Sequence, residues 1–66
     1  MKNTIKVERA KLNFTQQDLA DRVGVSRQTI NSIEAERYVP STLLALKISE
    51  VFKTTVNDIF KLENDD

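Results

Sequence analysis

The sequence has no cysteine and no histidine, and only one glycine and one proline among its 66 residues. These absences exclude disulfides and thiolate ligands and remove the commonest general base, so we expect neither an enzyme nor a metal or other cofactor. No apolar run approaches the roughly 20 residues of a membrane span, and the first residues lack the apolar core of a signal peptide. We therefore expect a cytoplasmic protein that does not bind a membrane.

Residues 15–35 predict two short helices joined by a tight turn. Thr15 followed three residues later by Asp18 is a capping-box pattern and indicates a helix start. Gly24 ends that helix, because glycine adopts the left-handed conformation at little cost. Ser26 is a favourable N-cap for the second helix. The apolar positions that have helical spacing, and would bury together, are Leu19, Ala20, Val23, Ile30 and Ile33.

Three further helices are expected to support this pair. Apolar spacing predicts the first over about residues 4–12 and the next over about residues 42–52. The last covers about residues 56–61 and opens with the capping-box spacing of Thr55 and Asp58.

The net charge is zero, with ten basic and ten acidic residues, whereas a domain that binds nucleic acid is usually basic. Residues 58–66 hold four acidic side chains and one lysine, so the rest of the chain has a net positive charge. Arg22, Arg27 and Arg37 flank the second helix of the pair, and we expect a positive face there and an acidic tail directed elsewhere. The length allows one domain, residues 1–66, with one small core.

Several runs of the sequence together match one known family. They are Thr15–Ala35, Tyr38–Ser41, Leu46–Ile48 and Asn57–Phe60. The match covers roughly residues 3–62, and its most specific part is Gly24–Asn31. In these residues the chain resembles the Cro/phage-repressor-like (Xre) helix-turn-helix family, in particular its small bacterial and archaeal members. The resemblance implies an all-α, five-helix, lambda-repressor-like DNA-binding domain that binds an operator as a homodimer and represses transcription.

The outward face of the second helix carries hydrogen-bonding side chains suited to the major groove. Arg27 can donate two hydrogen bonds to guanine, and Gln28 can pair in the same two-pronged way with adenine. The residues predicted to read bases are Ser26, Arg27, Gln28 and Asn31. The residues predicted to contact the DNA backbone are Gln16, Gln17, Thr29, Ser32, Arg37 and Tyr38.

The resemblance gives Arg9 and Glu34 an architectural role, because the matching positions form a buried ion pair between the first and third helices of that family. Read without the resemblance, each is a surface charge. Asn13, Glu36 and Lys53 stand where relatives commonly have glycine. A left-handed turn there would cost Glu36 and Lys53 roughly 1 kcal/mol or more each, unless the turns have another shape.

One recognition helix reads only a few base pairs, so we expect a homodimer on a near-palindromic operator, with half-site centres about 34–36 Å apart. The residues predicted for the dimer interface are Leu43, Ile59, Phe60 and Leu62, with packing in the core as the alternative. Lys61–Glu63 can also pair with Met1–Asn3, as in similar small regulators, to form a short two-stranded ribbon.

Two other functions remain open on the same fold. A protein-interaction module that no longer binds DNA would explain the neutral net charge, but nothing in folding requires Ser26, Arg27 and Gln28 at their positions. An antitoxin would bind DNA and also bury a surface, such as the acidic tail, against a toxin.

Overall fold

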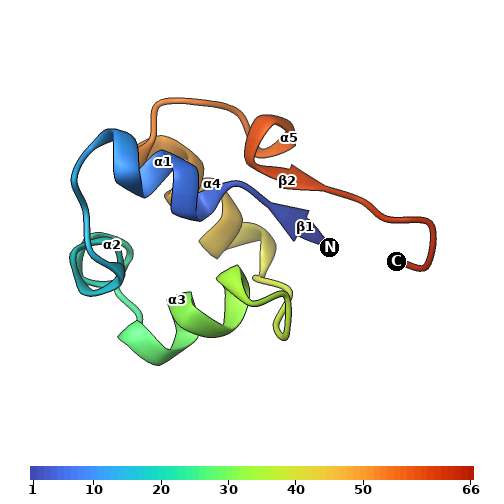
Figure 1. Ribbon diagram of the computed structural model, residues 1–66, viewed down its shortest axis with the longest axis horizontal. Coiled ribbons are helices and arrows are strands. Elements are labelled where there is room, and N and C mark those ends of the chain that lie inside the picture. The colour runs from blue at the N-terminus through green and yellow to red at the C-terminus, as the bar shows by residue number, and fades with distance from the viewer.

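Five short helices and a two-stranded ribbon surround one hydrophobic core in the computed structural model, which describes all 66 residues. The elements are β1 (Lys2–Asn3), α1 (Ile5–Lys11), α2 (Gln16–Val23), α3 (Arg27–Glu34), α4 (Thr42–Val51), α5 (Val56–Ile59) and β2 (Phe60–Lys61). In Figure 1, α2 and α3 lie at the lower left, and the ribbon and both termini lie at the right. The five-helix fold and the terminal ribbon are therefore confirmed. None of the helices is both long and apolar enough to cross a membrane.

Local capping interactions fix the ends of α2 and the start of α3. The Thr15 side chain accepts a hydrogen bond from the Asp18 backbone N–H at 3.0 Å, and Asp18 accepts one from the Thr15 N–H at 2.9 Å. The Thr15 N–H lowers the pKa of Asp18, because this hydrogen bond favours the ionised carboxylate. Gly24 is left-handed, with φ 76°, and the Ser26 hydroxyl accepts from the Thr29 N–H at 3.1 Å. The predicted boundary between the two helices is confirmed.

Three turns place a residue other than glycine in the left-handed conformation. Asn13, Glu36 and Lys53 have φ values of 57°, 62° and 54°. They follow α1, α3 and α4, where the chain must reverse. The turns therefore keep the shape that glycine would favour, and Glu36 and Lys53 bear the conformational cost.

The end of α5 differs from the prediction. The helix stops at Ile59, and Phe60 takes extended angles, φ −110° and ψ 134°, because the chain there joins β1 as a strand. Both side chains then turn into the core, where Ile59 is fully buried and Phe60 is 7% exposed. The expectation that Ile59 and Phe60 form a dimer surface was wrong.

The predicted capping box of α5 was also wrong in detail. The Thr55 hydroxyl donates to the Asp58 carboxylate at 2.9 Å, and no threonine side chain caps the Asp58 N–H. Two threonine hydroxyls, from Thr55 and then Thr54, lower the pKa of Asp58.

The ribbon pairs Lys2 with Lys61 and Asn3 with Phe60. Its second strand therefore begins at Phe60, one residue earlier than the predicted Lys61–Glu63.

The core draws side chains from every helix and from β2. It consists of Ile5, Leu19, Ala20, Val23, Ile30, Ile33, Leu44, Ala45, Ile48, Ile59 and Phe60. The five apolar positions predicted for α2 and α3 are all among them. The core thus holds α3 by one face and leaves its other face to solvent.

Candidate nucleic-acid interface

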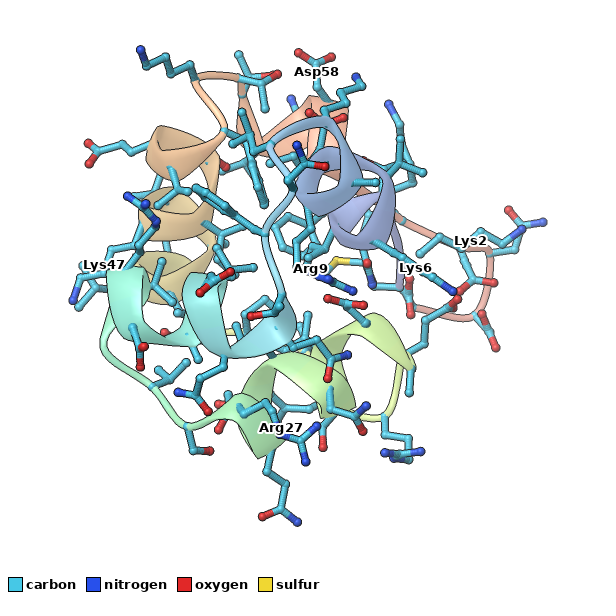
Figure 2. All side chains as sticks on the ribbon, turned by 60° about the vertical axis from the view of Figure 1, so that its left-hand side comes forward. Lys2, Lys6, Arg9, Arg27, Lys47 and Asp58 are labelled. Carbon is cyan, nitrogen blue, oxygen red and sulfur yellow. The ribbon has the colours of Figure 1, made fainter.

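Helix α3 presents its first turn outward. Ile30 and Ile33 are buried on the inner face, where α3 packs against α2. Arg27 and Gln28 are exposed, and Figure 2 shows Arg27 at the outer edge of the molecule, at the start of α3. The side chains best suited to read base edges therefore lie on an accessible ridge.

The N-cap residue of α3, Ser26, already has hydrogen-bond partners within the protein. The Ser26 hydroxyl accepts the Thr29 N–H and also lies 3.0 Å from the Thr29 hydroxyl. Gln28 differs, because its amide takes part in none of the side-chain hydrogen bonds of its neighbours. Among the predicted base-reading residues, the Gln28 side chain is the one left with its full hydrogen-bonding capacity.

Asn31 is held from both sides. Its amide nitrogen donates to Gln16 at 3.5 Å, and its oxygen accepts from Arg37 Nη2 at 3.1 Å. The side chain is half-buried. Asn31 therefore connects α2, α3 and the loop that follows α3, and it is less available than Arg27 or Gln28.

A shallow polar hollow lies beside α3. Its volume is about 290 Å³, and it is lined by Ser26, Gln28, Thr29, Ser32, Arg37 and Tyr38. One guanidinium, several hydroxyls and an amide in so small a space suit the oxygens of a phosphate. The structure thus brings together four of the six predicted backbone-contact residues, Thr29, Ser32, Arg37 and Tyr38.

The remaining two, both glutamines, lie on α2. Gln16 is half-buried against α3 and donates from its amide nitrogen to Glu34 at 3.4 Å. Gln17 is exposed and donates along its own helix to Asp21 at 2.7 Å.

Arg22 does not flank α3 as expected. Its guanidinium carbon lies 4.3 Å from the centre of the Phe14 ring, and its side chain lines a different hollow with Lys47 and Glu50 of α4. The positive charge beside α3 therefore comes from Arg27 and Arg37.

The predicted ion pair between α1 and α3 is present. Arg9 Nε lies 2.7 Å from Glu34 Oε2, and Nη2 lies 3.0 Å from Oε1. The side chains are 14% and 10% exposed. The hydrogen bond that Arg9 donates to Glu34 raises the pKa of Arg9 further. Arg9 also donates to the Phe14 carbonyl at 2.9 Å, so the guanidinium joins α1 to the start of α2 as well.

The acidic residues of the C-terminal segment lie away from the outer edge of α3. Figure 2 shows Asp58 at the end of the molecule opposite Arg27. Glu63 and Asp66 contact the N-terminal ammonium group of Met1 at 3.3 and 3.2 Å, and the hydrogen bond to Asp66 raises the pKa of that group. Part of the negative charge of the chain therefore lies away from Arg27.

Sequence reasoning missed several features of this region. The Asn3 amide donates to the Ile33 carbonyl at 2.9 Å and ties β1 to the end of α3. Val39 and Leu46, which are 61% and 51% exposed, line one largely apolar hollow. No spacing pattern reveals the Asn3 contact, because it joins residues 30 positions apart. The exposed Leu46 was detectable, since it follows Leu43 by three positions on one helix.

Comparison with known proteins gives a consistent family. A helix-turn-helix family model matches residues 5–59. An uncharacterized HTH-type transcriptional regulator of Methanocaldococcus jannaschii is 52% identical over the full length of both chains. The regulator YgzD of Bacillus subtilis, similarly described, is 48% identical over 98% of both chains, and one from Archaeoglobus fulgidus is 47% identical over all of this chain and 93% of its own. With the helix pair and its exposed polar ridge, these matches show that the chain belongs to the Cro/C1-type (Xre) helix-turn-helix family of DNA-binding transcriptional regulators.

Proposed function

We propose that this protein binds a specific double-stranded DNA operator as a homodimer and represses transcription, with α3 in the major groove. The observation that carries the proposal is the exposed pair Arg27 and Gln28 at the start of a helix whose opposite face is anchored in the core. Arginine suits the O6 and N7 acceptors of guanine, and glutamine suits the N6 donor and N7 acceptor of adenine. Such a regulator would act in the cytoplasm, at the nucleoid.

Phosphate contacts would come from the polar hollow beside α3. Arg37 and Tyr38 follow the helix in a loop and line the hollow with Thr29 and Ser32. A phosphate held there would fix the register of α3 along the groove, because backbone contacts position a protein and base contacts specify the sequence.

The dimer surface proposed here is the apolar α4 face, defined as Val39, Leu43 and Leu46. These side chains are 51–64% exposed, and Leu43 and Leu46 lie one turn apart on α4. Val39 follows the α3 loop directly, so a two-fold axis near this face would bring two α3 helices close together on one side of the dimer. A second copy is the occupant that supplies an identical apolar surface.

Selection of bound sequences from a random duplex pool at defined salt tests the function. The expected result is one near-palindromic sequence with half-site centres about 10 base pairs apart. Recovery of unrelated sequences, at salt concentrations where non-specific binding is weak, would contradict the proposal.

The contacts of the acidic tail argue against the antitoxin alternative. Asp66 and Glu63 are already engaged by the Met1 ammonium group, so a toxin would have to displace this contact before it could bind the tail.

A further inference from the structure

Two neighbouring hollows of the surface beside α3 each hold one cation and no carboxylate. The first is the polar hollow beside α3, which contains Arg37. The second contains Lys47 of α4. We propose that this second hollow, called the Lys47 hollow below, binds another phosphate of the DNA backbone, next to the phosphate at Arg37. This inference rests on the proposed function, because it adds a second positioning contact to the same interface.

The Lys47 hollow lies between the turn that joins α2 to α3 and the first part of α4. Its volume is about 300 Å³, and its walls include Val25, Thr29, Tyr38, Ser41, Leu43 and Lys47. Thr29 and Tyr38 also line the polar hollow beside α3. The two hollows therefore share a wall, and groups bound in them would lie side by side.

Charge distinguishes these two hollows from the other three on the surface. Lys47 is the only charged side chain in its hollow, and Arg37 is the only one in the polar hollow beside α3. Of the others, one contains Glu50 without a cation, one balances two cations with two carboxylates, and one has no charged side chain. An anion is therefore favoured in the two hollows that adjoin α3 and not in the other three.

The ammonium group of Lys47 is free to bind an anion. The side chain is exposed, and Figure 2 shows Lys47 at the outer edge of the molecule. Lys47 also borders a hollow with Asp21 and Glu50, but it forms none of the ion pairs of the molecule. A lysine with three donors on a flexible stem binds a phosphate as a point charge.

Other groups of the same hollow suit a nucleotide backbone. The Ser41 hydroxyl accepts the Leu44 N–H at 3.2 Å as the N-cap of α4, which leaves its own hydrogen free to donate. Tyr38 borders both hollows, so its hydroxyl can donate to an oxygen in either. Val25 and Leu43 form an apolar part of the wall, which suits the sugar next to a phosphate.

The shared wall also indicates which phosphates are bound. Phosphates that follow each other on one strand lie close together, whereas those of opposite strands are separated by a groove, about 12 Å wide in the case of the major groove. Two hollows with a common wall therefore suit neighbouring phosphates of one strand. Two such contacts fix the direction of that strand relative to α3, which a single contact cannot do.

The chain offers a matched control for Lys47. Lys47→Met removes the charge at nearly constant length, and Lys47→Arg keeps it. Lys53→Met makes the same change at an exposed lysine beyond the end of α4 that borders none of the hollows. Because Leu43 belongs both to the Lys47 hollow and to the apolar α4 face, sedimentation and circular dichroism must show that each variant keeps the wild-type mass and helix signal.

The first measurement is affinity against salt concentration, with cognate and non-cognate duplexes. Lys47→Met should reduce the slope of log affinity against log salt by about 0.9 and weaken binding to both duplexes by roughly eightfold at 0.1 M salt. Lys47→Arg and Lys53→Met should keep nearly the wild-type slope. An equal change of slope in Lys47→Met and Lys53→Met would reduce the effect to general charge and overturn the inference, as would a loss confined to the cognate duplex.

The second measurement uses cognate duplexes in which one phosphate at a time is replaced by a neutral methylphosphonate. One replacement should weaken the wild-type protein but have no effect on Lys47→Met, and the replacement to which Arg37→Ala is insensitive should be its neighbour on the same strand. The double variant should lose about two units of slope, since separate contacts add. A single position shared by both variants, or positions on opposite strands, would overturn the inference.

Failure of the proposed function has a different signature. A wild-type protein that binds all duplexes alike would show that the protein recognises no operator. The slopes of the three lysine variants on non-cognate DNA would still decide whether Lys47 binds a phosphate, because phosphate contacts contribute to non-specific binding as well. Absence of binding to any duplex would overturn both.

Discussion

Arg9 and Glu34 face each other between α1 and α3 through two parallel hydrogen bonds, 2.7 and 3.0 Å long, and Figure 2 shows Arg9 directed into the space between these helices. Removing one partner would leave the other charge largely buried. We expect Arg9→Met and Glu34→Gln each to lower the free energy of unfolding by about 3 kcal/mol, as measured by urea denaturation. Lys11→Met is the control, because the Lys11 side chain is 64% exposed in its pair with Glu8 and should contribute less than about 0.5 kcal/mol. Equal effects in the two pairs would contradict the architectural role.

The start of α3 should determine sequence preference. Arg27→Ala and Gln28→Ala should each cost about 1–3 kcal/mol on the selected operator and relax preference at one base position. Fluorescence anisotropy with cognate and scrambled duplexes measures both effects. If both variants kept the wild-type ratio of the two affinities, α3 would not be the reading helix.

Arg37 should act on all sequences alike. Arg37→Ala is expected to weaken cognate and non-cognate binding about equally and to reduce the slope of log affinity against log salt by about one unit, as for the loss of one phosphate contact. Lys61→Ala removes one positive charge where its side chain binds the Asn57 carbonyl of α5, and it should change the slope less. A loss confined to the cognate duplex would show that Arg37 reads a base or the shape of the groove.

The apolar α4 face should hold the dimer together. Leu43→Glu and Leu46→Glu should lower the mass measured by sedimentation while circular dichroism retains the helix signal, and operator binding should weaken. Val7→Glu changes a side chain on α1 that is 56% exposed and should leave the mass unchanged. Phe60→Glu should unfold the protein, since that side chain belongs to the core. A wild-type protein that stayed monomeric at operator-saturating concentrations would contradict the dimer model.

The turn after α4 should tolerate glycine better than lysine. Lys53 is exposed and has φ 54°, so Lys53→Gly removes the energetic penalty of a left-handed backbone. Glycine also raises the entropy of the unfolded chain, which opposes this gain. The net effect should be a free energy of unfolding higher by about 0.5–1 kcal/mol. Asn13→Gly should give a smaller gain, because asparagine tolerates this conformation. Thermal denaturation compares the two variants. A destabilised Lys53→Gly would mean that the lysine side chain stabilises the fold by more than its left-handed backbone destabilises it.

The parts of this structure that sequence could predict are those determined by neighbouring residues. The caps at Thr15, Gly24 and Ser26 each depend on a few residues. Helix α2 begins and ends, and α3 begins, where these caps predict. Whether Phe60 is helical or extended depends on pairing with Asn3, 57 positions earlier, so local periodicity assigned it wrongly.

The candidate site divides in the same way. Residue types on the outer face of α3 were readable from helical spacing, and Arg27 and Gln28 are indeed exposed. The hydrogen bonds of Gln16 to residues 11, 15 and 18 positions away depend on how α2 crosses α3 and on side-chain rotamers. No pattern along the chain specifies how two helices cross or which rotamers their side chains adopt. The contacts that hold Asn31 therefore could not be predicted when it was assigned to base reading.

The ribbon also has a consequence for the order of folding. The Thr4 N–H donates to the Ile59 carbonyl at 2.9 Å, and β2 is the only strand that pairs with β1. During synthesis the first strand emerges long before its partner exists, whereas α2, α3 and α4 can form from contacts within a short stretch of chain. Ile5 is fully buried in the same core cluster as Ile59 and Phe60, so this cluster is complete only after the C-terminal residues have been made. Closing so long a loop is slow compared with forming local helices. Strand β1 is therefore expected to pair late in folding, although it is synthesised before the helices.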